Sequence, residues 1–245
     1  MSLFLGFLEY ESLELSSFNL KFLDSSEKEK LRQFSNKFLK RQFLAGRLLA
    51  KSLLSAQLGI ALHSVKIKIH PSGRPINSAN IQFSLSHSNG LAACVTGQGL
   101  LGLDLERRAE RKHYISIARD FFHEPELILI ERGNSARSLQ LFYEYWTVKE
   151  AYIKANNMSV WNLKMVPPAK IGKKPEITQG NQDVESNFGN FERSQIEAIS
   201  YILSNEYILA IASSPAPDEI TIAPDFPLPE GFNFSETNRY AFDSL

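Results

Sequence analysis

Cysteine is almost absent from this chain of 245 residues, which carries only Cys94. A single thiol excludes an internal disulfide framework and a multi-cysteine metal site, and it favours a reducing compartment. Net charge is absent too, because 27 Lys and Arg residues balance 27 Asp and Glu residues. This balance argues against nucleic-acid binding through bulk positive charge. The remaining composition is that of a globular protein, long enough for one large domain or two small ones.

Long apolar segments are missing as well. Residues 75–103 form the longest stretch without a charged side chain, but they include asparagine, glutamine and serine, which lipid would leave without hydrogen-bond partners. The apolar start has no basic region, and Glu9 and Glu11 follow it closely, so we predict a first strand rather than a secretion signal. We therefore expect a cytoplasmic protein that does not bind membranes.

Common catalytic and nucleotide motifs are also lacking. The phosphate loop G-x-x-x-x-G-K-[ST] does not occur, and we expect neither a kinase nor a Rossmann-type nucleotide fold. The motif G-x-S-x-G is missing, so we do not expect an esterase-type catalytic serine. A catalytic Cys/His pair is not expected either, because the chain has only one cysteine. Any chemistry must come from other groups.

The zero net charge conceals a strong segregation along the chain. Residues 25–51 carry eight bases and two acids, whereas residues 215–245 carry six acids and one base. A basic block on a predicted helix is usually a solvated helix face. The alternative is a surface that binds phosphate groups or an acidic partner.

Hydrophobic periodicity predicts a mixture of helices and strands. Helices are predicted at 25–34, 38–58, 115–122, 124–131 and 139–156, and strands at 65–69, 81–85, 91–96, 100–105, 196–203 and 207–212. The sequence S-H-S-N-G is predicted to connect two of these strands. Five prolines between residues 215 and 229 predict an irregular tail on the surface.

One internal similarity bears on the fold. Residues 85–96 and 203–214 match at four of twelve positions, and each segment follows a long apolar helix. Chance can produce such a match, but two similar halves would explain it. We predict an α+β fold of two pseudo-symmetric subdomains, each a long helix packed on a small, mostly antiparallel sheet, with the active site in the cleft between them. The predicted divisions are an N-terminal subdomain (1–103), a C-terminal subdomain (104–214) and a Pro-rich acidic tail (215–245).

Two carboxylates follow each other on a predicted strand in the sequence G-L-D-L-E. Asp104 and Glu106 are two residues apart, so their side chains point to the same face of the strand. Their charges repel, a divalent cation relieves that repulsion, and oxygen-only ligands favour Mg²⁺ over zinc. The alternative is a solvated strand end, in which Glu106 pairs with Arg107 or Arg108.

The predicted helix 139–156 is apolar almost all round, which indicates burial. Trp146, Glu150 and Lys154 form one stripe on it at a spacing of four residues. An exposed Glu–Lys pair would be an ordinary salt bridge worth about 0.2–0.5 kcal/mol, but desolvating buried charges costs more than such a pair returns. A buried Glu150 close to the two strand carboxylates would be a natural third metal ligand.

A group of hydrogen-bond donors precedes these motifs in the sequence Ser84-Leu-Ser86-His87-Ser88, with Arg74 upstream. Hydroxyl, imidazole and backbone N–H groups donate to phosphate oxygens, and Arg74 adds a fixed positive charge. The alternative is a structural or exposed histidine. Combined with the two acidic motifs, this group predicts a magnesium site beside a phosphate-binding cleft, as phosphoryl transfer or pyrophosphate cleavage requires.

Three segments resemble the signature blocks of the Sfp-type 4′-phosphopantetheinyl transferase family. They are F-S-L-S-H-S, G-L-D-L-E and W-T-V-K-E-A-Y-I-K-A, in the family's order, and the looser features E-K-E-K-L-R-Q-F, F-L-A-G-R-L-L-A-K and G-R-P also fit. The resemblance covers about residues 1–214 and leaves the tail without a role. It implies a transferase that moves the 4′-phosphopantetheine group of coenzyme A onto a serine of an apo acyl or peptidyl carrier protein and releases 3′,5′-ADP.

The resemblance also implies roles for individual residues. Asp104, Glu106 and Glu150 would hold Mg²⁺, with Glu150 also acting as the base for the carrier serine. Lys154 would stabilise or protonate the leaving phosphate and contact coenzyme A. The remaining coenzyme A contacts would be Ser86, His87 on the 3′-phosphate, Arg74 and Lys30. Arg74 stands where lysine is common in the family. The family's basic residue before the long helix has no clear counterpart, because Gln42 aligns best with it and Arg41 is adjacent, so neither is assigned to the site.

Two other functions stay open at this point. A non-catalytic module could bind coenzyme A or a carrier protein without transferring anything, although a binder has no need of three converging carboxylates. A magnesium-dependent hydrolase could cleave the pyrophosphate with water. For the transferase we expect coenzyme A and an apo carrier protein as partners, no nucleic acid, and a monomer, because two halves of one chain form the cleft.

Overall fold

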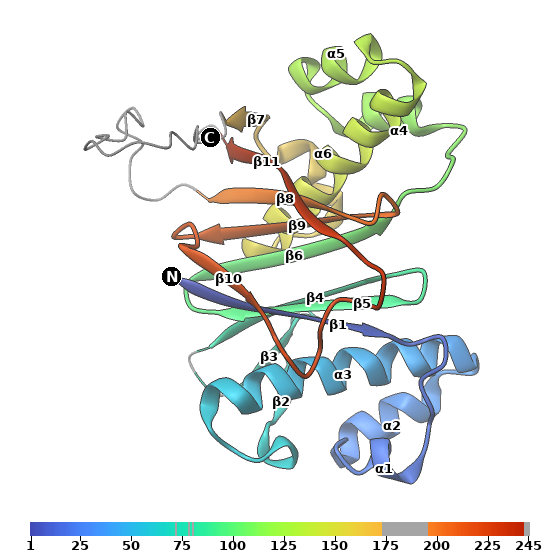
Figure 1. The fold of residues 1–245 in the computed structure, drawn as a ribbon, viewed down its shortest axis with the longest axis vertical. Helices are drawn as coiled ribbons and strands as arrows, with labels where there is room; N and C mark the ends of the chain where they lie inside the picture. Colours follow the sequence, from blue (N-terminus) through green and yellow to red (C-terminus); the bar gives the residue numbers. More distant parts are fainter. Residues whose placement is uncertain (72, 78, 80, 173–195, 243–245) are drawn as a thin grey trace.

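Two larger β-sheets and two long helices dominate the computed structural model, which describes all residues except 72, 78, 80, 173–195 and 243–245. The first sheet has the strand order β10-β1-β5-β4, and the second has the order β6-β9-β8-β11-β7. Figure 1 shows the two sheets meeting edge to edge near the middle of the molecule. Among the described residues, none of the helices is long and apolar enough to cross a membrane.

The N-terminal half contains the first sheet and the long helix α3 beside it (Figure 1). Apolar side chains of α3 pack on β1 and β5 in a common core, and α2 lies against the outer side of α3. The elements of this half are β1 Ser2–Glu9, α1 Ser17–Leu20, α2 Ser25–Gln33, α3 Lys37–Leu58, the 3₁₀ helix Leu62–Ser64, β2 Ile67–Ile69, β3 Pro75–Asn77, β4 Gln82–Ser88 and β5 Leu91–Gly97.

The C-terminal half contains the second sheet and the long helix α6, most of which is buried. Helices α4 and α5 pack on α6 at the far end of the molecule (Figure 1). The elements are β6 Leu100–Arg107, α4 Tyr114–Phe121, α5 Glu124–Arg132, α6 Ser135–Ala155, the 3₁₀ helix Val160–Met165, β7 Ala169–Gly172, β8 Glu197–Leu203 and β9 Tyr207–Ser214. The predicted α+β fold, with a long helix packed on a sheet in each half, is confirmed. The division at residues 103 and 104 remains a proposal.

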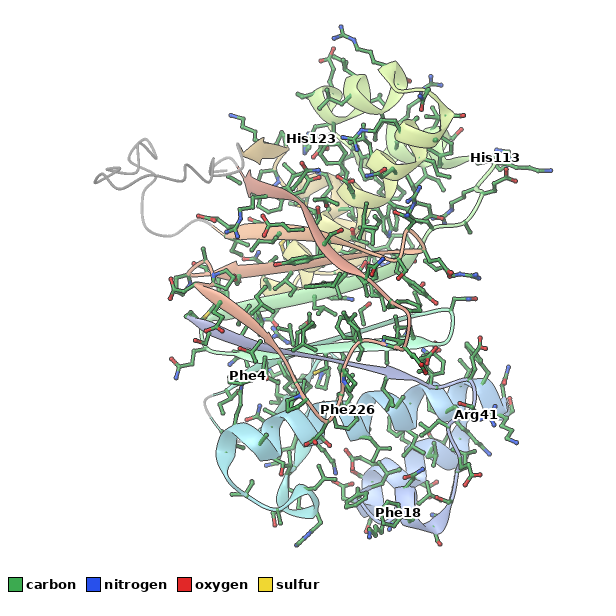
Figure 2. The ribbon with its side chains drawn as sticks, in the orientation of Figure 1. Phe4, Phe18, Arg41, His113, His123 and Phe226 are labelled. Atoms are coloured by element: carbon green, nitrogen blue, oxygen red, sulfur yellow. The ribbon has the colours of Figure 1, made fainter. Side chains whose placement is uncertain are left out.

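The tail is not irregular, and our prediction for it is wrong. β10 (Glu219–Ile222) pairs with β1 in a parallel arrangement, and β11 (Phe234–Phe242) lies between β8 and β7 in the second sheet. The five prolines lie outside both strands, so they shape only the connecting segments. Figure 2 shows Phe226 of the connection beside the N-terminal half, where its ring packs in the core of α3. The tail therefore joins both halves.

Strand β4 is longer than predicted, and this changes the position of the S-H-S sequence. The predicted strand ends at residue 85, but β4 continues to Ser88 and pairs with β5 along its whole length. Only Asn89 and Gly90 form the connection, with φ angles of 43° and 90° that suit a tight two-residue hairpin. Ser86 and His87 are therefore strand residues with fixed directions.

Residues 97–102 spell G-x-G-x-x-G, the pattern of a dinucleotide-binding loop. Here the segment connects β5 to β6, and no helix follows it. The physical role of that pattern is to bring a helix N-terminus to a pyrophosphate, which a strand-to-strand turn cannot do. The glycine pattern at this turn therefore gives no support to a Rossmann-type nucleotide site.

Gly102 allows α6 to lie directly against β6. A Cβ atom at this position would come within 1.9 Å of the carbonyl oxygen of Ala151 and 2.5 Å of the amide nitrogen of Ala155. Glycine thus permits a backbone contact between the strand that carries Asp104 and the helix that carries Glu150. The sequence G-L-D-L-E places this glycine two residues before the first carboxylate.

Gly102→Ala is expected to reduce the free energy of unfolding by about 2–3 kcal/mol, because the added methyl group forces α6 away from β6. Chemical denaturation measures the effect. Gly46→Ala is the control, because its Cβ would meet only Leu85 methyl groups at 3.8 and 3.9 Å and alanine favours the helix. Equal stabilities of Gly102→Ala and the unmodified protein would contradict the close contact.

Candidate functional site

The candidate site lies where β4 and β6, the facing edge strands of the two sheets, run side by side. These strands belong to different sheets and are linked by side chains. The Ser86 hydroxyl on β4 donates to Asp104 Oδ1 on β6 at 2.8 Å. Lys154 of α6 reaches the same oxygen, so three separate elements meet at one carboxylate. We call this junction of β4 and β6 the seam.

Asp104 is the centre of the site and is only 2% exposed. Its Oδ1 atom accepts hydrogen bonds from the Lys154 ammonium at 2.7 Å and from Ser86. Its Oδ2 atom is also buried, but no hydrogen-bond partner lies near it among the described residues. A buried carboxylate oxygen without a partner costs free energy, which a bound cation or donor would recover.

Lys154 is held by three acceptors. Its Nζ atom donates to Asp104 Oδ1, to the Leu103 carbonyl oxygen at 3.0 Å and to the Ser86 hydroxyl at 3.1 Å. Three bonds use all the protons of an ammonium group. Lys154 is therefore fixed in position, with its charge directed at Asp104.

Glu106 and Glu150 complete the acidic group, and both hold their protons more strongly than usual. Burial, followed by repulsion from Asp104, raises the pKa of Glu106 to about 7. The same two causes raise the pKa of Glu150 to about 7, although Lys154 and a hydrogen bond from Trp146 act in the opposite direction. Raised carboxylate pKa values of this kind are common where like charges share a functional site.

A divalent cation fits this group of side chains, although no ready-made centre is present. Among the described residues, no three His, Cys, Asp or Glu side chains are close enough to form a metal-binding cluster. Two observations favour a cation: Asp104 Oδ2 is buried without a partner among the described residues, and burial, with repulsion from Asp104 added to it, raises the pKa of both glutamates. Carboxylate oxygens are the ligands that Mg²⁺ prefers.

A cavity of about 300 Å³ borders the seam on the side of α3. Ser86 and His87 line it together with Gln42, Arg47 and several apolar side chains, of which Phe34 and Phe43 are in ring contact. The cavity thus has an apolar wall and polar lining residues, and one of these, Ser86, is hydrogen-bonded to Asp104. The sequence prediction places Ser86 and His87 in a ligand cleft, and both do line this cavity.

His87 is a neutral hydrogen-bond acceptor in this structure. Its Nε2 atom lies 2.8 Å from Nε2 of Gln42, and because an amide nitrogen only donates, the imidazole nitrogen accepts. Burial lowers the pKa of His87, and the positive charge of Lys154 lowers it further. Gln42 therefore acts here as the partner of His87.

The other three predicted coenzyme A contacts, Lys154, Arg74 and Lys30, lie outside this cavity's lining. Arg74 donates to Asn157 Oδ1 and, at 3.4 Å, to the carbonyl oxygen of Leu101, so it bridges from the N-terminal half to the C-terminal half. Burial lowers the pKa of Arg74. Lys30 is exposed on α2, with its ammonium 5.6 Å from the ring centre of Phe34, which does line the cavity.

A buried ion pair behind α6 was not foreseen from the sequence. Lys149, beside Glu150 in the W-T-V-K-E sequence, is 0% exposed and points away from the seam, with its ammonium 3.1 Å from Glu126 of α5. The other bonds of Glu126 go to the backbone N–H groups of His123 and Ala169. Lys149 therefore anchors α6 to α5. The sequence of α6 is apolar almost all round, and this pattern could have predicted burial for Lys149 as well as for Glu150.

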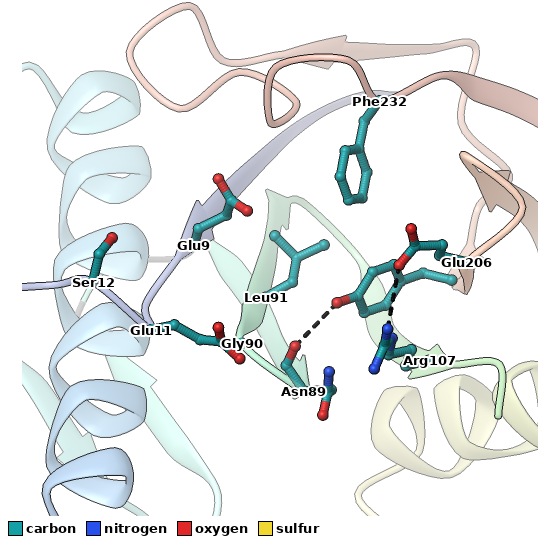
Figure 3. A pocket seen from close by; sticks show the side chains of 10 residues that line it. Glu9, Glu11, Ser12, Asn89, Gly90, Leu91, Arg107, Glu206 and Phe232 are labelled. Carbon is teal, nitrogen blue, oxygen red and sulfur yellow. Dashed lines mark hydrogen bonds and ion pairs between the residues drawn. The ribbon is translucent and has the colours of Figure 1, made fainter.

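A larger cavity of about 550 Å³ lies at the other end of the seam and holds none of the predicted site residues. Figure 3 shows it between the turn at Asn89 and Gly90, the end of β6 and the tail. The Tyr207 hydroxyl donates to the Asn89 carbonyl oxygen at 3.0 Å across the two halves, and Arg107 lies 3.6 Å from Glu206. We assign the chemistry to the smaller cavity, because one of its lining residues, Ser86, is hydrogen-bonded to Asp104.

The raised pKa of Glu106 predicts a pH-dependent stability change for Glu106→Gln. Below pH 4.5 the Glu106 carboxyl group is protonated in both the folded and the unfolded chain. Above pH 7 it is ionised in both, and the buried charge then destabilises the folded state. Without metal, the variant should match the unmodified protein near pH 4 and exceed it by about 1–3 kcal/mol near pH 8. Denaturation in a chelator measures this, with the exposed Glu29→Gln as control. A gain independent of pH would contradict the assignment.

Two family models match successive parts of the chain. The model described as "4′-phosphopantetheinyl transferase, N-terminal" matches residues 12–98, and the model of the "4′-phosphopantetheinyl transferase superfamily" matches residues 100–212. The second match contains Asp104, Glu106, Glu150 and Lys154, and the first contains Ser86 and His87. Both matches end before the tail strands.

Several characterised sequences are similar to the chain. The 4′-phosphopantetheinyl transferase HetI of Nostoc sp. is 31% identical over 163 residues, which are 64% of this chain and 69% of the relative. The transferase gsp of Aneurinibacillus migulanus is 35% identical over 112 residues, 46% of each chain. The transferase Sfp of Bacillus subtilis is 25% identical over 137 residues, 55% of this chain and 60% of that protein. The matched segments thus cover from under half to about two thirds of these relatives.

Proposed function

The chain belongs to the Sfp-type 4′-phosphopantetheinyl transferase family of enzymes, and from this premise we propose that it transfers 4′-phosphopantetheine from coenzyme A to a serine of an apo acyl or peptidyl carrier protein. The second product is 3′,5′-ADP, and the reaction depends on Mg²⁺. The observation that carries the proposal is the contact of Asp104 with Lys154 and with Ser86, which lines the cavity, while Glu106 and Glu150 lie near enough to Asp104 for its charge to add to the burial that raises their pKa values.

The cavity side of the seam suits the nucleotide end of coenzyme A. Ser86 and His87 present a hydroxyl group and an imidazole at the polar end of the cavity. We assign His87 to the 3′-phosphate, where the negative charge would favour the protonated imidazole. Arg74 and Lys30 supply fixed positive charge for the remaining phosphates. Arg74 would have to exchange its present partner Asn157 for substrate.

The acidic side of the seam suits the pyrophosphate. Asp104, Glu106 and Glu150 are the residues that would hold Mg²⁺, with Asp104 Oδ2 as the oxygen that has no partner. When bound, the ion neutralises charge on the pyrophosphate oxygens. Lys154 adds a second positive charge that its three hydrogen bonds keep in place.

Glu150 is the base in this mechanism. A serine hydroxyl is a weak nucleophile and needs a group that removes its proton as the bond to phosphorus forms. The pKa of Glu150, raised to about 7 by burial and by Asp104, suits a base that works near neutral pH. The carrier serine oxygen attacks the phosphorus that bears pantetheine, its proton passes to Glu150, and the bridging oxygen leaves with 3′,5′-ADP. Lys154 stabilises or protonates that leaving phosphate.

Further properties follow from the same proposal. All the groups named come from one chain, which supports a monomeric enzyme. The site has no feature that would select a nucleic acid or a membrane as partner, and we propose a cytoplasmic location from the reduced state expected for Cys94. Coenzyme A and the apo carrier protein are the proposed partners.

Product analysis tests the reaction. The chain is incubated with coenzyme A and Mg²⁺, with and without several apo carrier proteins, and the small molecules are separated. We expect 3′,5′-ADP only when a suitable carrier is present. Free phosphopantetheine formed without any carrier would instead indicate the hydrolase. Binding of coenzyme A without any product would indicate a non-catalytic module.

A further inference from the structure

Three serines on β4 form a ladder that joins the two sheets. Ser84, Ser86 and Ser88 alternate along the strand, so their side chains point to one face, toward β6. The backbone N–H of Leu103 donates to the Ser84 hydroxyl at 2.9 Å, and the N–H of Arg107 donates to the Ser88 hydroxyl at 3.0 Å. Side-chain oxygens therefore take the place that strand carbonyl groups would hold in a continuous sheet.

The two outer rungs of this ladder enclose the acidic pair. Leu103 precedes Asp104 directly, and Arg107 follows Glu106 directly, so the segment of β6 between the anchored amides carries both carboxylates. On its other edge, the same segment pairs with β9. The serines of β4 bond this segment directly to the strand that carries His87.

The Ser88 hydroxyl makes a second bond that matters for the site. It accepts from the Arg107 N–H and lies 3.3 Å from Glu106 Oε2, to which it donates its own proton. One hydroxyl therefore holds both the backbone and the side chain at this end of the acidic pair. Ser84 has a simpler environment: it is buried and accepts from Leu103.

We propose that Ser84 and Ser88 are positioning residues, which set the distance between the carboxylates of β6 and the cavity lined by β4. They act through the backbone of β6 and need not touch coenzyme A or the carrier. The inference rests on the proposed transferase function for its kinetic consequence, but its structural part does not. A displacement of about 1 Å at a reacting group can lower a rate about 100-fold, so loss of one rung is expected to affect the chemical step.

Amide hydrogen exchange tests the structural part directly on the free protein. Ser84→Ala should accelerate exchange at the Leu103 amide, and Ser88→Ala should accelerate it at the Arg107 amide, each leaving the other amide protected. Ser88→Thr keeps a hydroxyl group and should restore protection at Arg107. Unchanged exchange at both amides would overturn the ladder, whether or not the chain has transferase activity.

Steady-state kinetics test the positioning role. For Ser84→Ala and Ser88→Ala we expect kcat to fall about 10- to 100-fold, while KM for coenzyme A changes less than about threefold. Ser138→Ala is the matched control, because it removes a buried serine that bonds the Tyr114 hydroxyl at 2.9 Å, away from the seam. Its kcat should stay within about twofold, as expected when only packing is lost.

Three results would overturn the positioning role. The first is an unchanged kcat in both alanine variants while their amides exchange faster. The second is a fall in kcat that Ser138→Ala reproduces at equal stability, and the third is failure of Ser88→Thr to recover activity when exchange is restored. If the unmodified protein transfers nothing, the proposed function and the kinetic role of the serines are both refuted. The exchange experiment would still show whether Ser84 and Ser88 hold the backbone of β6.

Discussion

Glu150→Gln is expected to lower kcat about 10³-fold or more, because it removes the only group assigned to accept the serine proton and one of three oxygen ligands for the cation. The folded state should not suffer. Burial and repulsion raise the pKa of Glu150 to about 7, so near pH 8 the ionised carboxylate destabilises the native protein and a neutral amide does not. The variant should therefore unfold at the same denaturant concentration or a higher one.

A second carboxylate on the same helix serves as the contrast. Glu144 is 0% exposed and accepts hydrogen bonds from Gln140, Asn238 and Tyr240, so its charge is compensated. Glu144→Gln should lower stability and leave kcat of the folded fraction nearly unchanged. Transfer rates measured with purified carrier protein, together with denaturation curves for each variant, separate the effect on catalysis from the effect on stability. Full activity of Glu150→Gln would contradict its role as base.

Removal of residues 215–245 is expected to abolish cooperative folding. The tail supplies β10 to the first sheet and β11 to the interior of the second, and it packs Ile220, Leu228, Phe232 and Phe234 against the apolar core between the sheets. Without it, that core is open to water and β7 loses its neighbour. The loss should exceed the stability of about 5–15 kcal/mol that most domains possess. Far-UV circular dichroism during denaturation should show no sharp transition.

Removal of a single hydroxyl group tests the structural role of the tail in a chain that still folds. The Tyr240 hydroxyl on β11 donates to Glu144 Oε2 at 2.9 Å, and its loss leaves a buried carboxylate short of one donor. Tyr240→Phe should cost about 1–3 kcal/mol. The control is Tyr201→Phe, which removes the hydroxyl group of another buried tyrosine, one whose ring stacks on Phe234 of the same tail strand. Equal stability of the two variants, or a folded truncated chain, would contradict a structural role for the tail.

The predictions that held depended on short-range chemistry. Two carboxylates at a spacing of two on a strand must share a face, and Glu150 and Lys154 at a spacing of four on a helix must share a stripe. The apolar surround of that helix indicated burial. These local rules pair Asp104 with Glu106 and Glu150 with Lys154, and the hypothesis that combined the two motifs with Ser86 agrees with the hydrogen bonds among Asp104, Lys154 and Ser86.

The features that sequence reasoning missed depend on long-range pairing. Prolines between 215 and 229 correctly indicated irregular connections, but nothing local shows that Glu219–Ile222 pairs with the first strand or that Phe234–Phe242 enters a sheet. The extension of β4 through His87 likewise results from pairing with β5. Because that extension fixes the direction of Ser88, the ladder across the seam could not be derived from the S-H-S sequence alone.

The buried ion pair was the other feature that the sequence did not predict. Lys149 and Glu126 lie 23 positions apart in the printed sequence and form an ion pair at 3.1 Å inside the C-terminal half. Helical spacing shows which residues share a face with Glu150, but it does not show which element packs on the opposite face. The site itself was accessible to sequence reasoning, whereas the supports behind it required the tertiary structure.

The intact mass of an apo carrier protein is the most direct test of the account. After incubation with the chain, coenzyme A and Mg²⁺, we predict that the carrier gains the mass of one phosphopantetheine group on its serine, and that the gain disappears with Glu150→Gln or in a chelator. An unchanged mass for every carrier in a panel of fatty-acid, polyketide and peptide-synthesis carriers, with the chain folded and coenzyme A present, would contradict it.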